Sequence, residues 1–156
     1  MRFRIWVPNA ASVLVVGLFL ITSGLSAAPK DDVAAATAKW GQAIRDNDPD
    51  KVLPLYAENA VLWGTLSPKV RADWAALRDY FVSAFKILPE LKVTFGEQLI
   101  RVYGNAAVNT GYYIFGYVKD GEDKTLPARY SFTYVNEGGN WMIVDHHSSA
   151  VPPPPQ

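Results

Sequence analysis

The second half of the chain is a succession of four long runs rich in Val, Ile, Tyr, Phe and Thr. These runs are residues 91–103, 106–118, 125–135 and 140–148. The short segments between them are rich in Gly, Asn and Asp, the residues that favour tight hairpin turns. Such a pattern predicts four consecutive antiparallel strands. Three glycines inside the runs indicate bulges or bends, so we expect the sheet to be strongly curved.

The first half of the chain has a helical period instead. Residues 31–48 repeat apolar side chains every three or four positions, which predicts an amphipathic helix. Asn47-Asp-Pro-Asp50 then offers a cap for a short second helix. A short strand is predicted at residues 60–63, and a third helix follows with Asp73 as its cap. We therefore expect an α+β fold in which three N-terminal helices pack in a curved antiparallel sheet.

Residues 1–26 have the composition of an export signal. Arg2 and Arg4 give a positive start, an apolar core follows, and small residues precede the predicted cleavage point. Cleavage after Ser26 or after Ala28 fits, and we favour the first. The alternative is an uncleaved anchor, but the apolar core is shorter than the roughly 20 residues of a spanning helix. We expect a periplasmic or secreted protein with one domain at 27–150, a proline-rich tail at 151–156 and no membrane contact after cleavage.

Charge and composition exclude several classes of function. The whole chain has 15 basic and 15 acidic residues, and residues 1–26 contain two arginines and no acid, so the mature chain has a net charge of 13 minus 15, or −2. This balance argues against a nucleic-acid partner. The chain has no cysteine and only two histidines, which are adjacent, so we expect no metal site. Phosphate-binding loops and nucleophile elbows are absent from the sequence, and we expect no cofactor.

The order of the predicted elements resembles the cone-shaped, cystatin-like fold of the nuclear transport factor 2 superfamily. Ketosteroid isomerases and the SnoaL-like polyketide cyclases use the same fold. Short motifs are similar to bacterial relatives of the association domain of calcium/calmodulin-dependent protein kinase II. These motifs are Leu66-Ser-Pro-Lys-Val-Arg71, Leu77-Arg-Asp-Tyr-Phe81, Gly104-Asn-Ala-Ala107, Ala128-Arg-Tyr130 and Trp141-Met-Ile-Val-Asp-His-His-Ser-Ser149. The resemblance covers about residues 31–152 and implies a homo-oligomer with a deep pocket lined by arginines.

Six residues are candidates for a ligand pocket. They are Arg129, Arg71, Tyr113, Trp63, His147 and Asp145. The resemblance implies pocket positions for Arg129 and His147, whereas Tyr113 stands in place of a family arginine. Trp63 is included among these candidates, although aromatic residues on strands most often pack in cores or interfaces.

Asp145 and His147 are also the candidates for catalysis. Side chains alternate across a strand, so these two residues share one face while His146 is expected on the other. Only one histidine can therefore point into the cone. A carboxylate beside an imidazole orients it or raises its pKa, which suits a general base. The alternative is a hydrogen-bonded pair with a purely structural role.

Each arginine also has two interpretations. Arg129 lies in an aromatic run, where a buried guanidinium needs an anion as partner. It is either a clamp for a ligand carboxylate or one half of a buried ion pair with Asp145 or Glu97. Arg71 lies between a turn and the third helix, where it either reaches the mouth of the cone or caps a neighbouring carbonyl.

Two functions are consistent with these residues. The first is a non-enzymatic, exported module that forms a dimer or higher oligomer through an aromatic-rich outer sheet face and holds a small carboxylate or polar aromatic ligand. The second is an isomerase, dehydratase or cyclase in which Asp145 or His147 moves a proton while Arg129 or Tyr113 stabilises an oxyanion. We favour the first, because a few polar residues in a small cone do not require catalysis.

Overall fold

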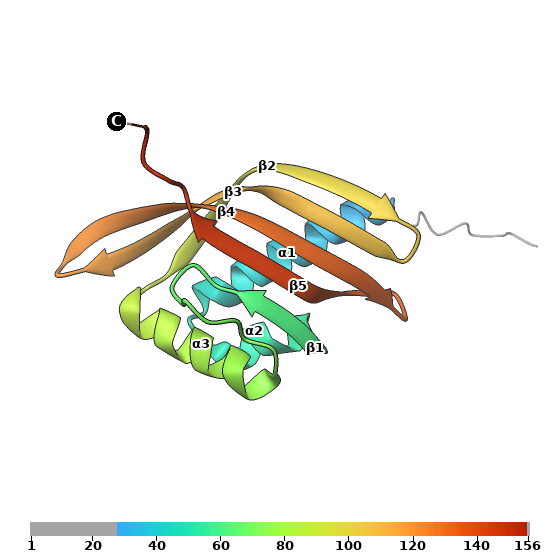
Figure 1. Ribbon diagram of the computed structural model, residues 1–156, viewed down its shortest axis with the longest axis horizontal. Coiled ribbons are helices and arrows are strands. Elements are labelled where there is room, and N and C mark those ends of the chain that lie inside the picture. Colours follow the sequence, from blue (N-terminus) through green and yellow to red (C-terminus); the bar gives the residue numbers. More distant parts are fainter. Residues whose placement is uncertain (1–27, 156) are drawn as a thin grey trace, which may run out of the picture.

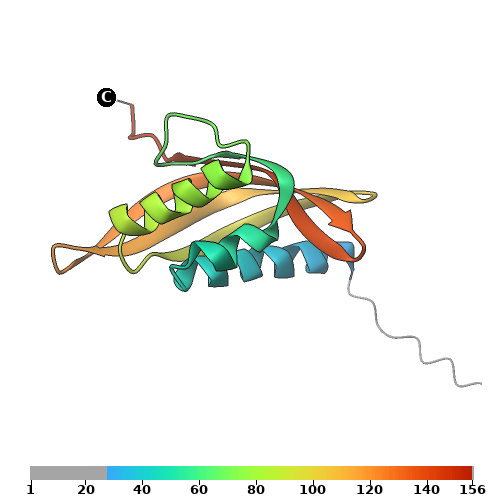
Figure 2. The same ribbon diagram turned by 90° about the horizontal axis from the view of Figure 1, so that it is seen from below.

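The computed structural model describes residues 28–155 and shows a curved five-stranded sheet wrapped around a long helix. Helix α1 (Pro29–Arg45) crosses one face of the sheet, and α2 (Pro49–Val52) and α3 (Trp74–Ile87) lie beside it (Figures 1 and 2). The expected α+β class is therefore confirmed. The predicted export signal lies outside the described residues.

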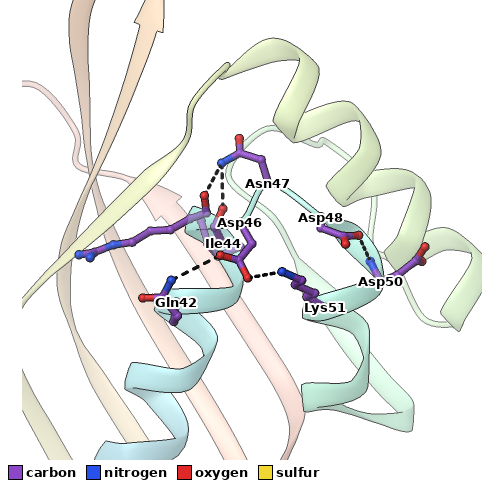
Figure 3. A network of polar contacts seen from close by, with 8 residues as sticks. Gln42, Ile44, Asp46, Asn47, Asp48, Asp50 and Lys51 are labelled. Carbon is purple, nitrogen blue, oxygen red and sulfur yellow. Dashed lines mark hydrogen bonds and ion pairs between the residues drawn. The ribbon is translucent and has the colours of Figure 1, made fainter.

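The end of α1 is fixed to the sheet by one asparagine. Asn47 adopts a φ of 50°, a left-handed conformation that asparagine tolerates better than most residues. Its side-chain amide donates to the carbonyl oxygens of Ile44 (3.2 Å) and Arg45 (3.0 Å), two of the last acceptors of the helix (Figure 3). The same side chain also donates to the carbonyl oxygen of Leu91 (3.1 Å) and accepts from its N–H (3.0 Å). This pairing joins the end of α1 to the beginning of the meander.

The predicted caps of the next two helices are present. Asp48 accepts a hydrogen bond from the N–H of Asp50 (2.9 Å) at the start of α2, and Asp73 accepts one from Ala76 (2.8 Å) at the start of α3. Pro54 lies in η1, a single 3-10 turn (Leu53–Leu55) that follows α2. Strand β1 (Tyr56–Trp63) then begins four residues earlier than the expected strand at 60–63.

The four predicted hairpin strands are confirmed, with ends that differ by a few residues. They are β2 (Lys92–Tyr103), β3 (Ala106–Lys119), β4 (Glu122–Glu137) and β5 (Asn140–Ala150). The order across the sheet is β1-β5-β4-β3-β2, and β1 pairs with β5 in parallel. The sheet is therefore mixed, which corrects the expectation of a wholly antiparallel sheet. The parallel pair joins strands separated by α3 and three strands of sequence, a contact that no local turn signal specifies.

A bulge in β5 decides which side chains enter the core. Across the β4–β5 pair, Thr133 is opposite Asp145 while Tyr134 is opposite Ile143, so Val144 is an extra residue on β5. One extra residue shifts the alternation of side chains by one position. Ile143 is buried before the bulge, and His146 is buried after it.

The core lies between the helices and the inner face of the sheet, and Trp40 of α1 is at its centre. The Trp40 ring is 1% exposed and lies 5.1 Å from the Phe132 ring and 6.3 Å from the Tyr113 ring, measured between centroids. Aromatic pairs at these separations stabilise a core beyond their buried area. After β5, residues 151–155 have no helix or strand and are exposed.

Candidate functional site

A small enclosed chamber lies between the inner face of the sheet, α3 and the loop after β1. Its free volume is about 20 Å³, which holds about one water molecule. The lining residues are Trp40, Thr65, Leu66, Tyr80, Phe81, Ala84, Leu88, Leu91, Tyr113, Phe115, His146 and Ser148. The wall is mostly apolar, and His146 is its one titratable group besides the tyrosines.

A chain of hydrogen bonds orients the imidazole of His146. The indole N–H of Trp40 donates to the hydroxyl oxygen of Tyr56 (3.0 Å), and that hydroxyl lies 2.8 Å from Nδ1 of His146. An indole nitrogen can only donate, so the Tyr56 hydrogen is free to bond Nδ1. We assign Nδ1 as the acceptor because this arrangement satisfies all three groups. The proton of neutral His146 is then on Nε2.

The Nε2 atom of His146 is buried and has no hydrogen-bond partner among the described residues. The whole side chain is 3% exposed. Burial lowers the pKa of His146 from 6.5 to about 3, with a smaller contribution from the charge of His147. The imidazole is therefore neutral near pH 7 and presents one N–H donor without an acceptor.

Three hydroxyl groups form a second polar feature of the chamber. The Tyr113 hydroxyl donates to the Ser148 hydroxyl, which also bonds the hydroxyl of Thr65. Burial raises the pKa of Tyr113 far above its ordinary value, so the phenol keeps its proton. The cluster joins β3, β5 and the loop after β1, and it holds that loop over the chamber.

The same loop places Arg71 near the chamber wall without bringing it into the lining. Arg71 pairs with Leu62 through both backbone hydrogen bonds, and its Nη2 donates to the Ser67 hydroxyl (3.2 Å). Its Nε is buried, and no partner for it lies in the described part of the chain. Burial raises the pKa of Tyr80, while the Leu66 backbone and the Arg71 charge act in the opposite direction. Arg71 thus acts electrostatically on a residue of the chamber.

Five of the six predicted pocket residues do not line the chamber: Arg71, described above, and four others. Arg129 and His147 are exposed, Trp63 is 50% exposed, and Asp145 is partly buried away from the lining. Asp145 and His147 point away from the chamber because the bulge at Val144 turns His146 inward instead of His147. Of the six, only Tyr113 is part of the chamber wall.

The outer residues also lack the partners that were expected. Nη2 of Arg129 is 3.4 Å from the Ser149 hydroxyl, and among the described residues no carboxylate forms an ion pair with it. The predicted ion pair with Asp145 or Glu97 is therefore wrong for this structure. Burial raises the pKa of Asp145, and the nearby charge of His147 lowers it. The carboxyl of Asp145 therefore senses the neighbouring imidazole, but outside the chamber.

Sequence reasoning missed most of the polar groups that do reach the chamber. The sequence left open which histidine faces inward, and it named His147 and not His146 as a pocket candidate. Thr65, which lines the chamber, and Tyr56, which bonds His146, were not singled out. The one available signal was the run Asp-His-His-Ser-Ser at the end of β5, which alternates between the two faces. Without the position of the bulge, that run does not say which residues point inward.

A second buried polar network lies deeper in the core and is closed. The Thr37 hydroxyl contacts the Tyr134 hydroxyl (2.9 Å) and accepts from the Asn109 amide (2.9 Å), which also donates to Gln98 (2.8 Å). Each side chain of this network has a partner, so its role is to join α1 to the sheet.

Two further classes of site find no support in residues 28–155. No cluster of three or more His, Asp or Glu side chains there is placed to hold a metal ion. None of the helices in that part of the chain is long and apolar enough to cross a membrane.

The fold is the cystatin-like fold of the nuclear transport factor 2-like class. The sequence model of the calcium/calmodulin dependent protein kinase II association domain matches residues 29–152. The chain belongs to this family. Comparison with curated proteins finds no match.

Solved structures agree with this assignment. A calcium/calmodulin dependent protein kinase II association-domain protein from Xanthomonas campestris is 35% identical, with a TM-score of 0.72 over 81% of this chain and 94% of that one. The CaMKII hub from S. rosetta is 18% identical, with a TM-score of 0.67 over 81% of this chain and 100% of that one. A nuclear transport factor 2-like protein from Salmonella enterica is 19% identical, with a TM-score of 0.71 over 81% of this chain and 93% of that one. The last two support the fold alone.

Proposed function

We propose that the protein is an exported, self-associating module that holds a small neutral molecule in its inner chamber. Export rests on the composition of residues 1–26. Self-association is supported by the family and by the S. rosetta hub, and it is consistent with the exposed apolar groups described next. Ligand binding rests on the donor groups of the chamber.

The observation that carries self-association is a row of side chains across the outer face of the sheet. One residue from each strand is in register in this outer row: Trp63, His147, Ser131, Thr110 and Leu99. Trp63 and Leu99 are 50% and 52% exposed, and nearby Tyr112 is 62% exposed. Exposed aromatic and aliphatic groups gathered on one face are typical of a protein interface. A two-fold dimer would cover the row with a second copy of itself.

The chamber favours a neutral ligand over the small carboxylate predicted from the sequence. Its wall contains no charged side chain, because the arginine expected to clamp a carboxylate, Arg129, is on the outer face. The unpartnered Nε2–H of His146 instead requires an acceptor such as a carbonyl oxygen. A polar aromatic molecule fits the aromatic wall. Since the free volume is about 20 Å³, binding requires side chains such as Tyr80 and Leu66 to move outward.

The enzymatic alternative has less support from the same geometry. Asp145 and His147 do not line the chamber, so neither is placed beside a molecule bound there. His146 does line it, but a pKa of about 3 makes it a weak base near pH 7. Binding without turnover is therefore the function that these residues support best.

Native mass spectrometry and light scattering test the two halves of this proposal separately. Leu99→Glu places a charge in the outer row, while Ile87→Glu changes an equally exposed residue on α3 (53%) and serves as the matched control. We expect Leu99→Glu to reduce the assembly to smaller species and Ile87→Glu to leave it intact. A wild-type monomer at micromolar concentration, or equal behaviour of the two variants, would contradict self-association through this face.

The chamber is tested with benzamide and benzoate, which have similar shapes but differ in charge. Wild-type protein is expected to bind benzamide more tightly than benzoate, and Ser148→Ala is expected to weaken benzamide binding because it disrupts the hydroxyl cluster. Preference for benzoate, or no bound mass for either probe and no co-purifying small molecule, would argue against the neutral-ligand proposal.

A further inference from the structure

A second recess lies at the far end of the molecule from the C-terminus, between α1 and the β4–β5 hairpin. It consists of two adjoining hollows of about 460 and 580 Å³ that share Asp32, Gly139 and Trp141. Ala36, Leu55, Met142 and Ile143 are apolar residues of its wall, and Asp32, Lys39 and Asn140 also line it. We call this recess the Trp141 groove. It is far larger than the inner chamber and opens at the surface.

The indole of Trp141 has an unused hydrogen-bond donor. Trp141 is 9% exposed, and its Nε1 is buried without a partner among residues 28–155. Two other tryptophans show what such a group usually does: Trp40 donates to Tyr56 (3.0 Å), and Trp74 donates to the Ala57 carbonyl oxygen (3.3 Å). A buried N–H without an acceptor is unfavourable, so an acceptor seated in the groove would stabilise it.

The chain contains a segment with the complementary chemistry. Residues 151–155, Val-Pro-Pro-Pro-Pro, are all exposed and form neither helix nor strand. Consecutive prolines favour the polyproline II conformation, whose carbonyl oxygens are not used within the segment. Recognition of such segments relies on aromatic-lined grooves that receive the proline rings, and tryptophan N–H groups are suitable donors to their carbonyls.

We propose that the proline segment of one chain docks in the Trp141 groove of a second copy. The proline rings pack against the apolar wall, and the indole N–H of Trp141 donates to a proline carbonyl oxygen. A small outward movement of the indole completes this bond. The contact joins two copies by a route that does not use the outer face of the sheet, so it stands independently of the interface proposed above.

The distance along the chain requires that the groove and the segment come from different copies. Trp141 is at the beginning of β5 and the proline segment leaves its other end, as both views of the fold show (Figures 1 and 2). Ten residues of strand from Trp141 to Val151 span about 33 Å. The N–H of Val151 donates to the Pro127 carbonyl oxygen (3.0 Å), which fixes the point of departure. Five residues of polyproline helix reach only about 16 Å beyond it.

Paramagnetic broadening between two differently labelled copies tests the contact directly. The chain has no cysteine, so Gln156→Cys gives a single position for a nitroxide label. Spin-labelled protein is mixed with ¹⁵N-labelled protein that has no nitroxide, and the indole N–H signals are recorded. We expect the Trp141 signal to lose most of its intensity and the Trp74 signal to keep it. Trp63→Phe and Trp74→Phe, both at exposed residues, assign the signals without a change in the groove.

Two matched variants decide the interpretation. Replacement of Pro152, Pro153, Pro154 and Pro155 by alanine in the spin-labelled copy is expected to remove the broadening, because the preformed conformation and the rings are lost. Leu99→Glu is expected to leave it, because the outer face is not involved. Unchanged Trp141 intensity, broadening of Trp63 in place of Trp141, or broadening that persists with the alanine segment would each overturn the proposal.

Discussion

Neighbouring residues on the two faces of the sheet differ sharply in burial. His146 is buried with a pKa of about 3, while the next residue, His147, is exposed. On β3, Tyr113 is 1% exposed and Tyr112 is 62% exposed. The inner face is apolar and almost uncharged, whereas the outer face has Arg129, Asp145 and His147 beside exposed aromatic groups. Residue type alone therefore does not indicate which residue belongs to a ligand site.

The difference also separates two kinds of molecular recognition. The inner face encloses about 20 Å³, and its unpartnered His146 N–H suits one small acceptor. The outer row is open and extends over all five strands, which suits a protein surface. In the function proposed above, one sheet thus serves a ligand and a partner without competition between them.

Deletion of Val144 tests how the bulge sets the two faces. Without the extra residue, Ile143 and His146 become second neighbours, which share one face of a regular strand. We therefore expect both side chains to stay buried and the free energy of unfolding to fall by no more than about 3 kcal/mol. Chemical denaturation measures the loss, and Val144→Ala, which keeps the number of residues, is the control. A deletion that leaves no folded protein while the alanine variant folds would mean that the inward position of His146 requires the extra residue.

The pH dependence of stability should distinguish the buried His146 from the exposed His147. The pKa of His146 is about 3 in the folded protein, and the ordinary value of 6.5 applies to the unfolded chain. The unfolded state binds more protons between these values, so stability is fully present above pH 6.5 and decreases as pH falls toward 3. The difference between the two pKa values corresponds to about 5 kcal/mol of unfolding free energy.

Unfolding free energies measured from pH 7 to pH 3.5 test this expectation against two variants. His146→Asn keeps an acceptor for Tyr56 but cannot titrate, so its stability should depend less on pH. His147→Asn keeps the buried imidazole of His146, so its stability should still decrease steeply as pH falls. The comparison between variants matters because the raised pKa of Asp145 contributes in the opposite direction, with stability lost as pH rises. Equal slopes for all three proteins would contradict the buried, neutral His146.

Truncation of adjacent tyrosines should produce the next largest contrast. Tyr113→Ala leaves a cavity beside Trp40 and removes a hydroxyl from the chamber cluster, so we expect a loss of about 3–5 kcal/mol. Tyr112→Ala removes an exposed ring and should change the stability of the isolated subunit by about 0.5 kcal/mol or less. Urea denaturation at low protein concentration measures both. A similar loss of unfolding free energy in the two variants would mean that the inner and outer tyrosines contribute equally to stability, despite their different exposure.

The smallest effect is expected for Arg129→Ala. Arg129 is exposed and makes one long hydrogen bond to Ser149 (3.4 Å), so its removal should change the unfolding free energy by less than about 0.5 kcal/mol. Arg129→Lys serves as the control that keeps the charge. A loss of several kcal/mol in the alanine variant alone would indicate a buried role for the guanidinium and would restore the ligand-clamp interpretation.

Local patterns were sufficient to predict most of the elements. The period of α1, the aspartates that cap α2 and α3, and the turns between the four long strands all depend on near neighbours in sequence. They could therefore be recognised without a structure. The beginning of β1 at Tyr56 was missed because its pairing with β5 is a contact across most of the chain.

The candidate site was predictable only in part. The sequence placed the polar residues near the end of β5, and it correctly indicated that the two histidines point in opposite directions. It could not decide which one faces inward, because Trp141 and Ile143 suggest one phase of alternation and the bulge imposes the other after Val144. The partners of His146, Tyr56 and Trp40, come from β1 and α1, far away in sequence.

By itself, the sequence determined the secondary structure, the α+β class and the family, because these depend on periodicity, turns and motifs within short stretches of chain. Only the tertiary structure decided the parallel position of β1, the inward turn of His146 and the outward position of Arg129. A single inserted residue exchanges the two faces of a strand, and its position becomes visible only when the neighbouring strand is paired with it.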